Sequence, residues 1–346
     1  MEKKIQLYKI PKIISKIKKE LINSEIRAIY KKYENVHIDD YLGAKYDFII
    51  MSEIEQELNK NFLNAPLEFF LKPKKTKMEI MFLGTNASIP GKNRNTSATL
   101  LKSGKELVLV DCGEGTVNQF LKINKSRQKK GWKMSKLKVI LITHLHHDHV
   151  GGLVGLLKMI NQRKMINHNL MIIGPCGIDN YVNYQLKVLD IKLDFKYDLH
   201  PLYKGITLNF KQLLYNIPMI RCFEVNHTIL CFSYMFLNEE DQCVIIFGDT
   251  NKAEKLIFFE DYEQKIDCVV HECTLDDSKR EVALKKFHST PSMVYDLCKH
   301  IKPEKLIITH FSNRYKEDEI LGLKDAIVEH GFKNVDIAED FKLVKI

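Results

Sequence analysis

Residues 143–152 read Thr-His-Leu-His-His-Asp-His-Val-Gly-Gly and directly follow the apolar run 137–142. The apolar run predicts a buried strand, and the polar residues after it predict a loop at the end of that strand. Histidine and aspartate side chains bind metals in proteins, and four of those in this stretch are the candidate ligands: His144, His146, Asp148 and His149. The first two alternate along an extended backbone and so point the same way, while the other two follow in the turn. One zinc with an open position needs fewer donors, so the sequence predicts two metal ions.

Length and composition fit a large α/β protein. The chain has 346 residues, enough for one large domain or two smaller ones, and a formal net charge of +9. This charge favours polyanionic partners, although a merely soluble basic protein fits it equally well. The eight cysteines form no Cys-x-x-Cys pair, so we expect buried, reduced thiols. The chain has no membrane-length apolar stretch and no signal-peptide pattern, so we expect an intracellular protein without a membrane partner.

Residues 1–76 differ from the rest of the chain because they are rich in lysine. Apolar residues recur at helical spacing after Pro11, and Ser52 and Glu55 fit a capping box that starts a second helix. We expect a short helical, basic N-terminal extension over 1–76, followed by the main domain over 77–346. Docking onto the main domain is the expected role of the first helix. A membrane-surface or organelle-targeting helix is the alternative, which its acidic residues and the near absence of arginine disfavour.

Strand and helix signals alternate along the main domain, and polar groups follow the strands. The expected strands and helices cover 78–83, 98–101, 107–110, 153–160, 170–174, 291–300 and 317–330, with Ser289 and Thr290 as the cap of the helix that starts at Pro291. Further apolar strands lead into 225–227, 244–250, 268–274 and 306–312. Ligands gather at such strand ends in layered α/β folds. Asp111 ends the second hairpin strand, where it could hydrogen-bond a metal-ligating histidine.

Three more ligands are expected from these distant strand ends. Asp249 follows a buried strand, where a charge is costly unless a cation meets it, so we expect it between two metals. His310 ends its strand in the same way, with a core histidine bound to a backbone carbonyl as the alternative. His227 completes the set. His200 and His168 compete for its role, although each sits in a loop-like segment.

Eight short motifs occur in order along the main domain. They are Phe-Leu-Gly-Thr at 82–85, Pro-Gly-Lys-Asn-Arg-Asn at 90–95, Asp-Cys-Gly-Glu-Gly-Thr at 111–116, the histidine loop at 144–152, Gly-Asp-Thr at 248–250, His-Glu-Cys-Thr at 271–274, His-Ser-Thr at 288–290 and His-Phe-Ser-Asn-Arg-Tyr at 310–315. In these motifs the chain resembles tRNase Z, the endonuclease that removes 3′ trailers from precursor tRNA, and in particular the catalytic half of its long form. Glyoxalase II and other relatives share the histidine loop but lack the second motif and the last two. The resemblance implies a metallo-β-lactamase fold, a four-layer αββα sandwich of the α/β class.

The resemblance also implies the ligand sets of two zinc ions per chain. One zinc would be bound by His144, His146 and His227 and the second by Asp148, His149 and His310, with Asp249 as a bridge. Two such metals can lower the pKa of a shared water to about 7 and neutralise the charge of a scissile phosphate. Asp148 would orient or deprotonate that water. Cleavage would leave a 3′-hydroxyl on the tRNA and a 5′-phosphate on the trailer.

Two further sets of residues follow from the resemblance. His288 would protonate the departing alkoxide, with Glu272 holding its tautomer, and a histidine that merely flanks a helix start is the alternative. Lys92, Arg94 and Asn95 look like the loop that meets the tRNA acceptor end, where cations pair with phosphates.

The chain departs from the family after His227. The family has small residues with glycine there, whereas this chain has Thr-Ile-Leu-Cys-Phe at 228–232. The 21 residues 228–248 leave room for a hairpin with its turn at 238–241, and no room for the long arm that short-form members insert here. Contacts to precursor tRNA must then come from basic segments such as 72–77 and 125–133, from a second copy in a homodimer, or from a partner protein.

The leading hypothesis is therefore a zinc-dependent tRNA 3′-processing endoribonuclease in the nucleus or cytoplasm, ahead of the mitochondrion. One alternative is a hydrolase of small esters or thioesters, for which the basic charge and the Lys92 loop would have no purpose. The other is a non-catalytic RNA-binding relative, against which the complete set of costly polar side chains argues.

Overall fold

The computed structural model describes residues 77–125, 131–205, 208–211, 214, 216–217, 219–252 and 265–346. Residues 75–346 form one compact unit. The helices and the capping box expected within 1–76, the basic segment 72–76 and part of the segment 125–133 lie outside the described residues.

The first sheet runs in the order β14-β1-β2-β3-β4-β5-β6. Its strands are β14 (Leu343–Lys345), β1 (Met78–Gly84), β2 (Ala98–Ser103), β3 (Glu106–Val110), β4 (Leu137–Leu141), β5 (Leu170–Pro175) and β6 (Tyr197–Leu202). β2 pairs antiparallel with β1 and β3, which confirms the predicted hairpin, and β3 to β6 pair in parallel. Parallel strands need crossover connections, and helices supply them here.

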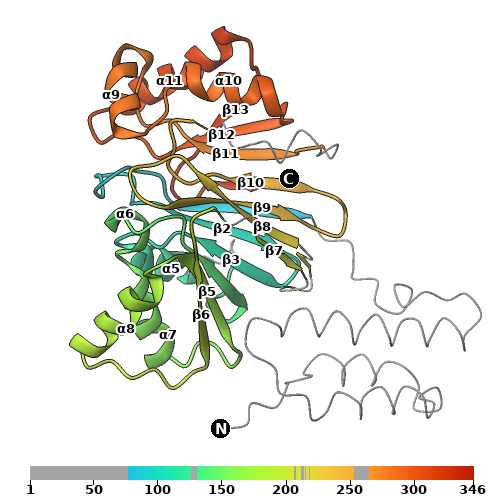
Figure 1. The fold of residues 1–346 in the computed structure, drawn as a ribbon. Coiled ribbons are helices and arrows are strands. Elements are labelled where there is room, and N and C mark those ends of the chain that lie inside the picture. Colours follow the sequence, from blue (N-terminus) through green and yellow to red (C-terminus); the bar gives the residue numbers. More distant parts are fainter. Residues whose placement is uncertain are drawn as a thin grey trace, which may run out of the picture. The chain divides into compact units, whose positions relative to one another are not determined.

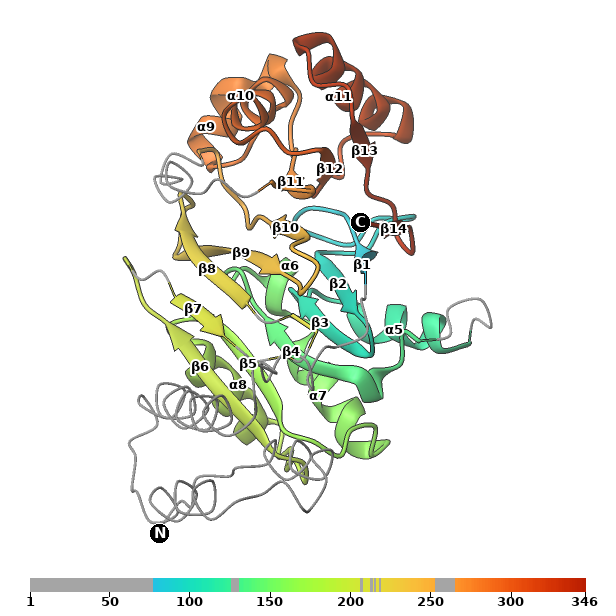
Figure 2. The ribbon, with the colours of Figure 1, turned by 90° about the vertical axis from the view of Figure 1, so that its right-hand side faces the viewer.

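The second sheet runs in the order β13-β12-β11-β10-β9-β8-β7. Its strands are β13 (Val335–Ile337), β12 (Lys305–Thr309), β11 (Cys268–Glu272), β10 (Cys243–Ile246), β9 (Cys231–Leu237), β8 (Met219–Val225) and β7 (Leu208–Lys211). β10 to β13 pair in parallel, and β7 to β10 pair antiparallel. Residues 228–248 consist of a short loop and the β9–β10 hairpin, as the spacing predicts; Figure 2 shows β8, β9 and β10 in succession.

Helices cover the outer face of each sheet. The helices among the described residues are α5 (Thr116–Lys125), η3 (Met134–Lys136), α6 (His147–Val150), α7 (Leu153–Gln162), α8 (Ile178–Val188), η5 (Asp277–Lys279), α9 (Arg280–Lys286), α10 (Pro291–Ile301) and α11 (Glu317–His330). Figure 1 shows α10 and α11 on one side of the stacked sheets and α7 and α8 on the other. The predicted four-layer αββα sandwich is confirmed.

The alternation of side chains along each strand separates three apolar layers. Leu109 of β3 packs in the layer between the first sheet and its helices, whereas its neighbour Val108 packs between the two sheets. Val269 of β11 packs in the third layer, against α10 and α11. The buried Tyr234 hydroxyl between the sheets donates to the Ile142 carbonyl at 2.7 Å, so this polar group is not left unsatisfied.

Two local expectations need correction. Thr290 precedes α10 in the extended conformation of an N-cap, but its side chain makes no capping hydrogen bond. Cys176 is exposed, because it follows the last residue of β5, whereas the other seven cysteines are buried as predicted. Among the described residues, no helix combines the length and apolar character that crossing a bilayer requires.

Candidate metal centre

The first wall of the centre follows β4. His144 and His146 leave the strand in extended backbone, and Asp148 and His149 lie in the short helix α6. Glycine is needed where this segment returns to the sheet, because a Cβ on Gly152 would lie 2.2 Å from the carbonyl oxygen of Gly113. The close crossing of the two backbones holds the histidine loop against the residues that follow β3.

The second wall comes from the ends of strands in the other sheet. His227 follows β8, Asp249 follows β10 and His310 follows β12. Since β10 to β12 run in parallel, their carboxyl ends meet at one edge, where the histidine loop also lies. The structure thus brings together all seven side chains that were expected to bind metal.

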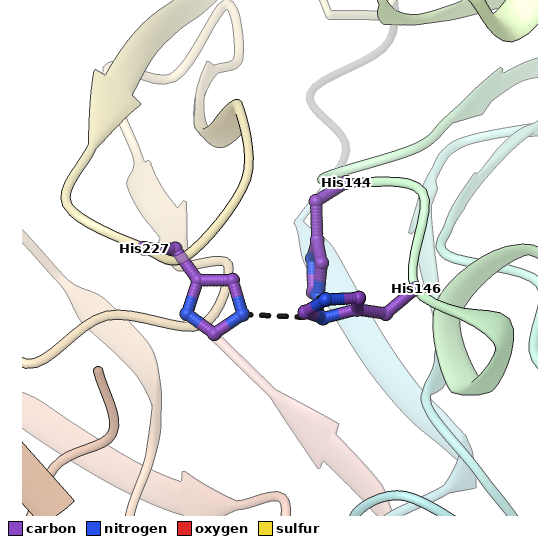
Figure 3. A group of neighbouring side chains, drawn as sticks. All are labelled: His144, His146 and His227. Carbon is purple, nitrogen blue, oxygen red and sulfur yellow. Dashed lines mark hydrogen bonds between the residues drawn. The ribbon is translucent and has the colours of Figure 1, made fainter. Parts of the chain in front are cut away.

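The first ligand group consists of His144, His146 and His227. The Nε2 atom of His144 lies 2.9 Å from Nδ1 of His146, which lies 3.2 Å from Nε2 of His227. Figure 3 shows the three rings converging. Tetrahedral zinc with bonds of 2.0–2.1 Å would separate such nitrogens by about 3.3 Å, so the group fits one ion after a small expansion.

The second ligand group consists of Asp148, His149 and His310. Nε2 of His310 lies 3.2 Å from Nε2 of His149 and 3.3 Å from Oδ2 of Asp148. Asp249 lies beside both groups, with Oδ2 3.7 Å from His144 and 3.4 Å from each of His149 and His310. Its ion-pair partners among the described residues are all histidines, so this carboxylate, 3% exposed, calls for a cation.

Hydrogen bonds on the far side of each ring fix which nitrogen faces the centre. His149 donates from Nδ1 to Asp111 at 2.7 Å, the contact expected for Asp111. His310 donates from Nδ1 to the Thr274 hydroxyl at 2.9 Å, and His227 donates from Nδ1 to the Phe287 carbonyl at 3.1 Å. Each bond leaves Nε2 free to bind a metal.

Sequence reasoning missed three of these anchors. Thr143 lies 3.0 Å from Nδ1 of His144, Thr274 holds His310, and the Phe287 carbonyl holds His227. Thr143 precedes a predicted ligand and Thr274 lies inside a motif, so the sequence could have suggested that their hydroxyls hold histidines. It could not have suggested the Phe287 carbonyl, because every residue has a backbone carbonyl.

Burial and neighbouring charges shift the pKa values of the predicted ligands. Burial, reinforced by the nearby His149, holds the pKa of His144 well below its ordinary value, and burial also lowers the pKa of His146 and of His227. Neutral imidazoles are the form that binds metals. Burial opposes ionisation of Asp249, but His310 and His149 outweigh it and hold the pKa of this carboxyl well below its usual range.

His288 and Glu272 form a pair beside the ligand groups. Nδ1 of His288 donates to Oε1 of Glu272 at 3.0 Å and lies 3.9 Å from Oδ2 of Asp249. Glu272 is buried at the end of β11 and also accepts from the Thr250 backbone N–H at 3.0 Å. Burial lowers the pKa of His288, but the Glu272 carboxylate outweighs it and raises the pKa to about 9, so the ring is protonated at neutral pH.

The loop that was expected to meet tRNA contains one buried residue, Arg94. Its guanidinium is 7% exposed, pairs with Glu317 at 2.7 Å and donates to the Ala338 carbonyl at 2.5 Å. Arg94 therefore ties the loop to the C-terminal part of the fold. Asn95 also turns inward, with its amide donating to the Glu114 carbonyl at 2.7 Å, whereas Lys92 is exposed.

The same loop reaches the centre at another point. The backbone N–H of Ser88 donates to Oδ2 of Asp148 at 2.6 Å. The two competitors of His227 lie elsewhere. His168 binds the Leu137 carbonyl, and His200 lies exposed in the strand β6 rather than in the loop-like segment that was expected.

Two residues of the centre have left-handed backbone. Asp111 and His310 both have φ of 61°, at the ends of β3 and β12. This conformation is unfavourable for residues with a Cβ, and here it turns each side chain into the centre.

The fold and the centre define a metallo-β-lactamase-fold protein, and comparisons with known proteins agree. Human tRNase Z, short form, has a solved structure that superposes with a TM-score of 0.64 and 28% identity, covering 77% of this chain and 98% of that chain. Ribonuclease Z of Listeria monocytogenes serovar 1/2a is 26% identical over 323 residues, 78% of this chain and 99% of the relative.

Two further matches define the family. Ribonuclease BN of Proteus mirabilis is 30% identical over 317 residues, 78% of this chain and 100% of the relative. The family model described as Anti-Pycsar protein Apyc1 matches residues 78–332. The chain belongs to the metallo-β-lactamase-fold family that these matches define, that of ribonuclease Z, ribonuclease BN and the Apyc1 proteins.

Proposed function

We propose that this chain is an endoribonuclease that removes 3′ trailers from precursor tRNA and uses two zinc ions. Relatives named ribonuclease Z and ribonuclease BN align over 78% of the chain, which supports hydrolysis of RNA. The two ligand groups would each hold one ion, with Asp249 between them. When bound, the ions would supply an acidified water and positive charge beside the scissile phosphate.

The protein's own residues would then handle the protons. Asp148, with Oδ2 held by the Ser88 backbone at 2.6 Å, would orient the attacking water or accept its proton. His288 would give its Nε2 proton to the departing 3′-oxygen, while Glu272 holds Nδ1. The products would be a 3′-hydroxyl on the tRNA and a 5′-phosphate on the trailer.

The observation that carries this proposal is the His288–Glu272 pair. The 3′-oxygen of RNA leaves as an alkoxide, which is a poor leaving group unless it is protonated. A thiolate, with a pKa of about 8.5, leaves without such help. An imidazole held at Nδ1 by a buried carboxylate can donate from Nε2, which fits RNA cleavage and has no purpose in thioester hydrolysis. Ester hydrolysis also releases an alkoxide, and the relatives named ribonuclease favour RNA over esters.

Precursor tRNA with a 3′ trailer tests the proposal directly. The protein should cleave it at the trailer junction, lose activity with chelator and regain it with zinc, and end mapping should give the products named above. Tight binding without cleavage would favour the non-catalytic RNA-binding relative. Products with a 3′-phosphate would contradict the proposed direction of attack.

A second candidate is hydrolysis of a small phosphodiester. The compact β9–β10 hairpin favours it, because a small substrate needs no arm to grip a tRNA body. Comparing kcat/KM for precursor tRNA with that for bis(p-nitrophenyl) phosphate separates the two candidates. Precursor tRNA should be the better substrate by several orders of magnitude if the first proposal is right.

The division into a basic extension, 1–76, and a catalytic domain, 77–346, is part of the proposal. The extension would contribute phosphate contacts in place of the arm, with a second copy of the chain or a partner protein as the alternatives. Deleting residues 1–71 should weaken binding of precursor tRNA and reduce its dependence on salt. Unchanged binding, together with a dimer in solution, would favour the second copy.

A further inference from the structure

The helix α9 ends at the centre and is tied to it by backbone carbonyls. The Phe287 carbonyl, directly after α9, accepts from Nδ1 of His227 at 3.1 Å. The Leu284 carbonyl accepts from the Asn251 amide, two residues after Asp249, at 3.1 Å. These two hydrogen bonds hold the backbone of α9 beside the predicted ligands, so its last turn lies close to the centre.

Two exposed cations stand on this last turn, Lys285 and Lys286. In the part of the chain that the structure describes, neither lysine makes an ion pair. Arg280, at the start of the same helix, differs because it donates to the Ser292 hydroxyl at 2.6 Å. Among the described residues, no carboxylate thus competes with an incoming anion for these two lysines.

The position of the acid decides which part of a substrate these lysines meet. His288 follows Lys286 by two residues, and in the proposed reaction it must lie within hydrogen-bond reach of the departing 3′-oxygen. That oxygen belongs to the last nucleotide of the mature tRNA. Because Lys286 is only two residues from His288, we expect this end of α9 to lie beside the RNA on the 5′ side of the scissile bond rather than beside the trailer.

We propose that Lys285 and Lys286 form a phosphate-binding site that holds the 3′ end of the tRNA next to His288, the proposed general acid. This inference rests on the proposed function and extends it to a surface that the family motifs do not include. The lysines would pair with backbone phosphates of the single-stranded acceptor end, which makes the contact independent of base sequence. They would take over part of the grip that the missing arm would otherwise supply.

The double variant Lys285→Gln/Lys286→Gln tests this phosphate-binding site in the full chain. Its matched control is Lys158→Gln/Lys187→Gln, which removes two exposed charges from α7 and α8 on the other side of the sheets (Figure 1). Binding of precursor tRNA and of mature tRNA ending in a 3′-hydroxyl is measured at two salt concentrations. Bound metal and Tm verify that each variant is intact.

We expect the α9 variant to lose affinity for both RNAs, with the slope of log affinity against log salt reduced by about 1.4, or 0.7 for each lost single-strand phosphate. The control variant should lose less affinity for each RNA, and its salt slope should change less than that of the α9 variant. Parent-like affinity and slope would overturn the inference, and a lower Tm in that case would mean that the lysines only complement the C-terminal end of α9.

Loss of affinity for precursor tRNA alone would also overturn it, because the lysines would then face the trailer. Failure of the proposed function is separate and visible: the parent protein would bind or cleave no precursor tRNA at all.

Discussion

The two walls of the candidate centre are built in opposite ways. The first takes all its groups from residues 144–149, one strand end and one turn of helix. The second collects single residues from the ends of β8, β10 and β12, which meet only because the second sheet has its particular strand order. Short-range sequence therefore specifies the first wall, whereas the topology of the whole domain specifies the second.

Removing one ligand from each wall should have the largest effect. His149→Ala leaves the first ligand group intact, so we expect it to lose one bound ion and all cleavage. Asp249→Ala removes the carboxylate that lies beside both groups, so we expect both ions to bind poorly. Metal content per chain and precursor-tRNA cleavage measure the difference. Full activity in either variant would refute the two-metal site.

His288→Ala should come next, because it removes a proton donor and no expected ligand. We expect cleavage to slow by roughly 10² to 10⁴ with metal content unchanged. Loss of metal would instead make His288 a ligand.

The pH profile sharpens this prediction. Glu272 raises the pKa of His288 above its ordinary value of 6.5 to about 9, so the proton needed for the leaving group is present below pH 9 and lost above it. Parent activity should fall as pH rises through about 9. The His288→Ala variant should lack that decline, and a decline that persists in it would assign the titration to another group.

Arg94→Ala should affect the fold before it affects RNA. Glu317 is 56% exposed, so the ion pair itself contributes at most about 1 kcal/mol. The Ala338 carbonyl and the Thr85 hydroxyl lose a buried partner, so we expect a total loss of about 2 kcal/mol in unfolding free energy. Chemical denaturation measures this loss. An unchanged midpoint would mean that Arg94 does not stabilise the fold and would favour a role in RNA binding.

Lys92→Ala should have the smallest effect. The side chain is exposed, so we expect parent-like stability and a several-fold rise in KM for precursor tRNA. Hydrolysis of bis(p-nitrophenyl) phosphate should change less. Equal losses on both substrates would mean that the loop shapes the centre rather than contacting RNA.

Arg94 and Lys92 lie in the same loop, yet only the exposure of Lys92 agrees with what the sequence predicted, and the same contrast holds elsewhere in the structure. The strands and the histidine loop could be predicted because apolar runs and local spacing determine them. The convergence of His227, Asp249 and His310 could be expected from strand ends, although their roles as ligands stay predictions. The burial of Arg94 could not be predicted, because its partners Glu317 and Ala338 come to it through the tertiary fold, which no local pattern reveals. The Phe287 carbonyl had no signature for the same reason.

The left-handed backbone at Asp111 and His310 has a consequence for evolution. A residue with a Cβ in this conformation costs roughly 1–2 kcal/mol, less for aspartate than for histidine, whereas glycine would hold the same backbone without that cost. Drift to glycine at position 111 would remove that cost, but it would also leave the buried Thr143 backbone N–H, which donates to Asp111 at 2.8 Å, without its partner. The chain instead has a carboxylate and an imidazole there. The contacts of the two side chains therefore offset the backbone cost: Asp111 accepts from Thr143 and His149, and His310 donates to Thr274.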